Sequence, residues 1–132
     1  EKKPVVMGCY GIGPSRIMGA AAEINNDEKG IIWPEEISPF KIHLISLDGS
    51  ANSEKIKNTA EEIYQDLQQK GAEVLYDERE EKTAGEKFAD ADLIGIPRRV
   101  VISEKTIKEN SVEIKKRDES KTKLIKIKDL RF

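Results

Sequence analysis

Strand-like and helix-like segments alternate between residues 41 and 115, and this alternation constrains the fold more than any other feature of the sequence. Residues 41–47 and 72–76 are short runs rich in branched apolar side chains, which are typical of buried strands. Between them, apolar side chains recur at helical spacing from Ser53 onward, and Gly71 is well placed to end that helix. Residues 41–76 are therefore predicted to fold as a strand, a helix and a second strand.

A second helix and two further strands follow. Residues 83–86 (Thr-Ala-Gly-Glu) have the spacing of a capping box, and Gly95 marks the end of the helix that they begin. Residues 100–102 and 112–115 are predicted strands, and turns are predicted at 48–50 and 109–111. This order predicts an α/β fold, a three-layer-like arrangement of helices on a mixed sheet. The first helix carries an apolar set at helical spacing, and the second carries three apolar residues; they are Ile56, Ala60, Ile63, Tyr64 and Leu67 in the first and Phe88, Ala91 and Leu93 in the second.

Composition narrows the possible function classes. The chain has 132 residues, of which 36% are charged and 37% hydrophobic, and no window is apolar enough for a membrane span, so we expect a cytoplasmic protein. Cys9 is the only cysteine, which excludes an internal disulfide and a thiolate zinc cluster. His43 is the only histidine, and no metal site is expected. Because Cys9 and His43 have no partner nearby in the sequence, both are interpreted as structural residues.

The net charge of −2 conceals a difference between the two parts of the chain. Residues 1–97 hold 11 Lys and Arg against 19 Asp and Glu, whereas residues 98–132 hold 12 against 6. A basic segment of this kind can face an anionic partner. A solvated, lysine-rich edge is the alternative, and charge alone favours it.

Residues 8–16 (Gly-Cys-Tyr-Gly-Ile-Gly-Pro-Ser-Arg) join a predicted strand at 3–9 to a predicted helix from about Ser15 to Asn25. Two glycines at such a turn let the backbone approach a ligand closely, and Arg16 adds a permanent positive charge. The third glycine of the dinucleotide fingerprint is missing, since Arg16 stands in its place. Spacing alone therefore favours an ordinary tight turn over a dinucleotide site.

The full spelling of this segment resembles the third signature motif of class II aminoacyl-tRNA synthetases, in the form found in bacterial-type prolyl-tRNA synthetases. Residues 27–40 are similar to the passage out of that family's catalytic domain, and residues 87–97 resemble its anticodon-binding domain. The resemblance implies a strand-helix remnant of the catalytic domain with its linker at residues 1–37, and an anticodon-binding domain at residues 38–132.

The same resemblance implies particular site residues. The intact enzyme would use ATP, with Mg²⁺, to attach proline to its tRNA through prolyl-adenylate, and would be a homodimer. Arg16 would be the catalytic contact to the ATP phosphates, Gly11 and Gly13 would line the ATP pocket, and Cys9 and Gly11 would lie near the proline pocket. The first two class II motifs are missing from the sequence, so we expect this chain alone to bind proline tRNA without forming prolyl-adenylate.

Charged residues near the ends of the predicted strands are candidates for reading the two guanines shared by proline anticodons, since such side chains suit the edges of guanine. Residues 118–128 are lysine-rich and do not clearly match the family. A non-catalytic, synthetase-like RNA-binding module is the alternative, as is a threonyl- or histidyl-type synthetase, which would not predict the Cys9-Tyr10 spelling. The candidate anticodon-binding residues are Asp77, Arg79, Lys87, Glu104, Lys115 and Arg117.

Overall fold

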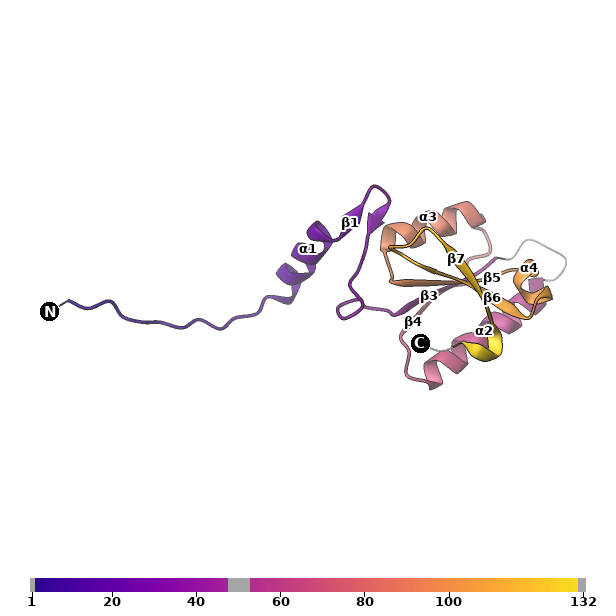
Figure 1. The fold of residues 1–132 in the computed structure, drawn as a ribbon, viewed down its shortest axis with the longest axis horizontal. Coiled ribbons are helices and arrows are strands. Elements are labelled where there is room, and N and C mark those ends of the chain that lie inside the picture. The colour runs from indigo at the N-terminus through magenta and orange to yellow at the C-terminus, as the bar shows by residue number, and fades with distance from the viewer. Residues whose placement is uncertain (1, 48–52, 131–132) are drawn as a thin grey trace.

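A five-stranded mixed sheet lies between two layers of helices in the computed structural model, which describes residues 2–47 and 53–130 (Figure 1). The strand order is β4-β3-β5-β6-β7, with β4, β3 and β5 parallel and the β5-β6 and β6-β7 pairs antiparallel. This confirms the predicted α/β fold with a mixed sheet. The strands are β3 (Ile42–Ser46), β4 (Val74–Asp77), β5 (Arg98–Ile102), β6 (Ser111–Lys116) and β7 (Thr122–Lys126).

The helices α2 (Ser53–Gln69) and α3 (Ala84–Ile94) cover opposite faces of the sheet (Figure 1). Each connects two parallel strands, and the two crossovers run in opposite directions along the sheet. Because such crossovers are right-handed, the helices must lie on different faces. The main apolar core lies under α2, whose residues Ile56, Ala60, Ile63 and Leu67 pack against Ile42, Leu44, Val100, Ile102 and Val112.

The layer under α3 is unusually polar. Lys87 and Ala91 are the residues of α3 that are buried, whereas Leu93 is 60% exposed. Phe88 instead contacts a cation, with the Arg99 guanidinium carbon 4.6 Å from the centre of its ring. Charged side chains therefore attach much of α3 to the sheet.

The ends of α3 follow the sequence prediction. Thr83 accepts a hydrogen bond from the backbone N–H of Glu86, and the Glu86 carboxylate accepts one from the backbone N–H of Thr83. This capping box satisfies two donors that the first turn of a helix leaves unpaired. Gly95 ends the helix in the left-handed conformation, with φ 80°.

The N-terminal part contains α1 (Pro14–Ile24) and a hairpin of β1 (Asn26–Asp27) and β2 (Gly30–Ile31). Residues 2–13 form no strand, so the strand predicted at 3–9 is wrong: these residues extend away from the sheet (Figure 1), and Val6 is 97% exposed. A strand needs a neighbour to pair its backbone groups, and no other strand of the described residues lies beside this segment.

Five elements were not predicted: the strands β1 and β2 of the N-terminal hairpin, and three elements in the C-terminal part. The short helix α4 (Glu104–Lys108) begins at a capping box formed by Ser103 and Thr106, and β7 and the 3-10 turn η1 (Ile127–Asp129) occupy the lysine-rich segment. In that segment Ile125 of β7 pairs with Val112 of β6 and is partly buried, whereas its neighbours Leu124 and Lys126 are exposed. The turn predicted at 48–50 lies outside the described residues.

Candidate functional site

The carboxyl ends of the parallel strands bring several of the predicted site residues together. Strand β4 ends at Asp77, with Arg79 two residues further on, and Glu104 follows β5 as the first residue of α4. In open sheets with parallel strands, ligands bind outside this edge. The edge formed by β3, β4 and β5 is therefore the candidate functional site.

Two carboxylates hold the Arg79 side chain at this edge. Its Nε and Nη2 donate to Asp77 Oδ1 and Oδ2 at 2.9 and 2.7 Å, and Nη2 also donates to Asp90 Oδ2 at 2.8 Å. Hydrogen bonds from Arg79 hold the pKa of Asp77 below its ordinary value. The Arg79 side chain remains 40% exposed, so it presents an oriented guanidinium to solvent.

Lys87 is a buried residue of α3 that contacts the same edge of the sheet. Only 1% of its surface is exposed, and its ammonium donates to the Ser46 carbonyl oxygen at 2.7 Å. This bond ties α3 to the end of β3. Its positive charge also contributes to the lowered pKa of Asp77. Because Lys87 is enclosed by the protein, the structure places it behind the site, where it positions other groups.

Lys115 and Arg117 lie at the opposite end of the sheet. Lys115 is half-buried and pairs in register with Arg99, near the start of β5. Arg117 is 8% exposed, and its backbone N–H donates to the Pro97 carbonyl, just before β5 begins. The structure therefore brings Asp77, Arg79 and Glu104 to one edge and separates Lys115 and Arg117 from them.

Asp90 is a member of the site that sequence reasoning missed. It lies on α3, three residues after Lys87, and its carboxylate meets Arg79 eleven residues away in sequence. Asp90 and Ala91 are three and four residues after Lys87, and residues at this spacing share one face of a helix. Because Ala91 faces the sheet, this spacing was the signal that the two charged side chains lie on the same face. A polar contact face of α3 could have been inferred from it.

The N-terminal candidates form a separate, open depression of about 560 Å³ lined by residues 11–16. A Cβ added to Gly11 would meet no atom within 4 Å, and Cys9 is exposed. An open backbone beside one arginine suits one wall of a phosphate-binding site. Within residues 2–47 and 53–130, no cluster of acidic, histidine or cysteine side chains is arranged to hold a metal ion.

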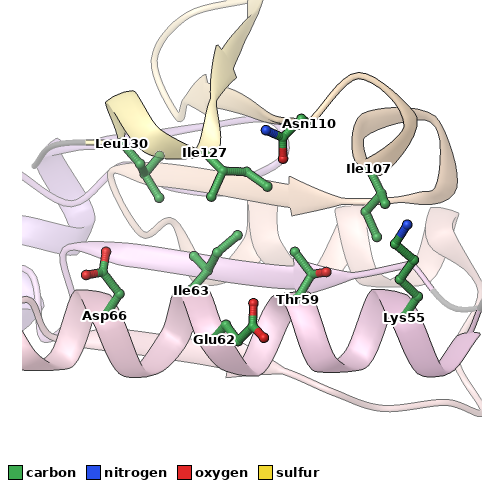
Figure 2. A pocket seen from close by; sticks show the side chains of 9 residues that line it. All are labelled: Lys55, Thr59, Glu62, Ile63, Asp66, Ile107, Asn110, Ile127 and Leu130. Atoms are coloured by element: carbon green, nitrogen blue, oxygen red, sulfur yellow. The ribbon is translucent and has the colours of Figure 1, made fainter.

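A second cleft, of about 380 Å³, lies on the α2 side of the sheet (Figure 2). Ile63 of α2 faces Ile127 and Leu130 across it, and Glu62 and Asp66 stand on the helix beside them. Lys55 also lines the cleft, so its charged side chains are two carboxylates and one ammonium. None of the predicted site residues lines it.

Comparison with known proteins decides the family. The anticodon binding domain family matches residues 39–131, which is more than half of the chain. The chain belongs to this family. Among the described residues of this anticodon-binding domain protein, no helix is both long and apolar enough to cross a membrane.

Several curated relatives are closely similar to this family member, and each is named proline–tRNA ligase. The protein from Persephonella marina is 50% identical over 98% of this chain and 22% of its own length. A protein from Legionella pneumophila is 47% identical over 96% of this chain and 22% of its own length, and one from Sulfurihydrogenibium is 48% identical over 97% and 22%. The chain thus spans about a fifth of the length of these relatives.

A solved structure supports the fold. The Giardia lamblia prolyl-tRNA synthetase, in complex with prolyl-adenylate, superimposes with a TM-score of 0.77 and 24% identity. The match covers 87% of this chain and 25% of that one. The α/β architecture described above is therefore shared with that protein.

Proposed function

We propose that this chain is the C-terminal part of a proline–tRNA ligase and that its main task is to bind the anticodon loop of proline tRNA. The closely similar relatives align with nearly the whole of this chain, and each is named proline–tRNA ligase. The family match supports anticodon binding. The segment that resembles the third class II motif supports a ligase over a separate RNA-binding module, which has no need of an ATP motif.

The observation that carries the proposal is the Arg79 guanidinium held at the carboxyl edge of the parallel strands. Asp77 and Asp90 occupy the Nε and Nη2 donors of Arg79, which leaves Nη1 to donate to the O6 or N7 acceptor of guanine. The two carboxylates fix the guanidinium in advance, so little side-chain freedom is lost on binding. Glu104, which follows β5 on the other side of β3, supplies an acceptor for the guanine amino and imino groups.

Four residues of the predicted anticodon set therefore divide into two roles. Arg79 and Glu104 contact the RNA bases, while Asp77 and Lys87 position the edge. Lys115 is a peripheral cation on the same side of the sheet as α3.

In the intact ligase, Arg16 would contact the ATP phosphates, and Gly11 and Gly13 would let the nucleotide lie against the backbone. Cys9 would lie near the proline pocket. ATP with Mg²⁺ and proline are substrates of that larger protein, which we propose to be a cytoplasmic homodimer. The domain boundary between residues 37 and 38 remains part of this proposal.

The test is a fluorescence anisotropy titration of this chain with a labelled proline anticodon stem-loop and with a loop in which both shared guanines are replaced. A hydrogen bond from a charged group contributes about 1.5–3 kcal/mol, so Arg79→Ala should weaken binding about 10- to 150-fold and remove the guanine preference. Arg79→Lys keeps the charge and should lose the preference while binding more tightly than Arg79→Ala.

Lys70→Ala is the matched control, because Lys70 is an exposed cation that pairs with Asp66 at the far end of α2. It should leave the preference unchanged. Equal and strongly salt-dependent binding of both loops would contradict base recognition and would indicate a basic surface only. Proline-dependent exchange between ATP and pyrophosphate by this chain alone would contradict its assignment as a non-catalytic part.

A further inference from the structure

The β1-β2 hairpin and Trp33, two residues after β2, pack closely on the C-terminal end of α3. A Cβ on Gly30 would lie 2.4 Å from a backbone atom of α3, and one on Gly95 would lie 2.0 Å from the Ile31 carbonyl oxygen. The Trp33 backbone N–H donates to Gly95 O at 3.1 Å, and its indole N–H donates to Ile94 O at 3.0 Å. The two segments thus meet with no space for a side chain between them.

Arg117 closes this contact from a third segment, just beyond β6. Its Nη1 and Nη2 donate to the two carboxylate oxygens of Asp27 at 2.8 and 2.6 Å, and its Nε donates to the Asp92 carbonyl at 2.9 Å. Arg117 keeps the pKa of Asp27 far below its ordinary value. A single buried side chain therefore bridges the hairpin, α3 and the end of β6.

Helix α1 is hydrogen-bonded at its C-terminal end to residues of the same hairpin. The Asn25 side-chain amide donates to Ala21 O at 2.9 Å, the Asn26 amide donates to Glu23 O at 2.8 Å, and the Ile32 N–H donates to Asn25 O at 2.8 Å. Ala21 is the residue of α1 that is buried. Helix α1 has little packing surface of its own, so the hairpin sets its direction.

We propose that Arg117 is a positioning residue that clamps the β1-β2 hairpin to α3 and thereby fixes the direction of α1 relative to the anticodon-binding domain. Helix α1 carries Arg16 in its first turn, so the clamp holds the ATP-contacting segment and the RNA-reading edge in one arrangement. The value of that arrangement to the ligase rests on the proposed function, whereas the clamp itself rests on these contacts alone.

Helix α3 connects the two ends of the arrangement. Asp90 contacts Arg79 at the candidate RNA edge, and the residues from Asp92 to Gly95 receive the hairpin. Arg117 is itself buried. Its role therefore differs from the base contact that was predicted from its position two residues after Lys115.

The test measures the distance between spin labels on Glu23→Cys of α1 and Gln69→Cys of α2, both exposed, in a Cys9→Ser background. Arg117→Lys should broaden the distance distribution, because one ammonium cannot replace a fork that binds a carboxylate and a carbonyl together. Asp27→Asn should also broaden it, and since Asp27 lies on the exposed hairpin, the domain stays folded. Lys116→Gln, at the exposed neighbouring position, is the control and should leave the distribution unchanged.

Trp33 is the only tryptophan, so its fluorescence gives a second readout. Both clamp variants should shift its emission to longer wavelength, and both should bind the anticodon stem-loop within about twofold of the unmodified chain. Unchanged distances and emission in both variants would overturn the clamp. Loss of stem-loop binding with unchanged distances would overturn it too, since it would make Arg117 an RNA contact. A chain that binds no stem-loop at all would contradict the proposed function, while the distances would still decide the clamp.

Discussion

Acidification from pH 7 to pH 5 should destabilise this domain, chiefly through His43. The side chain is 2% exposed, and it lies on the α3 face of β3, in register with Leu75 and Arg99. Its Nδ1 has no hydrogen-bond partner in the part of the chain that the structure describes. Burial lowers the pKa of His43 from 6.5 to about 4, with Arg99 and Arg79 adding to the effect and Asp77 and Asp90 opposing it.

The size of the effect follows from the two pKa values. The unfolded chain gains a proton near pH 6.5, while the folded chain stays neutral down to about pH 4, so the stability present above pH 6.5 is lost as the pH falls between these values. The loss is about 2 kcal/mol between pH 7 and pH 5 and about 3 kcal/mol in full. Typical domains are stable by about 5–15 kcal/mol, so the change is easily measured.

Urea unfolding at pH 7, 6 and 5 tests this prediction, with His43→Leu as the matched variant. Because His43 is the only histidine, the variant has no side chain that ordinarily titrates in this range. Its free energy of unfolding should be nearly constant from pH 7 to pH 5, whatever its absolute value. Parallel curves for the two proteins, or a histidine proton resonance in the folded protein that titrates near pH 6.5, would refute the reasoning.

Two substitutions test the backbone of the fold. Gly95→Ala and Gly71→Ala both place alanine at φ 80°, which costs about 1–2 kcal/mol. Only Gly95→Ala also drives a Cβ into Ile31 O, so it should cost clearly more and shift Trp33 emission; equal urea midpoints for the two would contradict this. Thr83→Ala removes the cap of α3 and should cost about 1 kcal/mol in urea unfolding, and no change would show that the box contributes nothing.

The sequence determined the sheet and most of the elements on it. The pattern of Ile56, Ala60, Ile63 and Leu67 predicted α2 because helix periodicity is local and its apolar face must be buried. The capping box at Thr83 and the left-handed Gly95 also predicted their helix ends, since caps are formed by neighbours in sequence. The right-handed crossover rule then fixes which helix lies on which face.

Only the tertiary structure decided which charged residues are buried and what they contact. The sequence gives Lys87 and Arg117 the appearance of surface cations, but Lys87 binds a carbonyl 41 residues away and Arg117 a carboxylate 90 residues away. Burial of a charge depends on partners that the fold brings together, and no local pattern encodes them. The predicted strand at 3–9 is wrong for the same reason. A strand needs a neighbouring strand to pair with, and none lies beside residues 3–9 in the part of the chain that the structure describes.

The candidate site shows the same division. Its position at the ends of the parallel strands followed from the order of elements, as did the presence of Asp77, Arg79 and Glu104 there. Which of these faces solvent depended on Asp90, whose helix had to be packed on the sheet before its carboxylate could orient Arg79. Local periodicity and capping are written along the chain, whereas the partners of a buried charge exist only once distant segments have met.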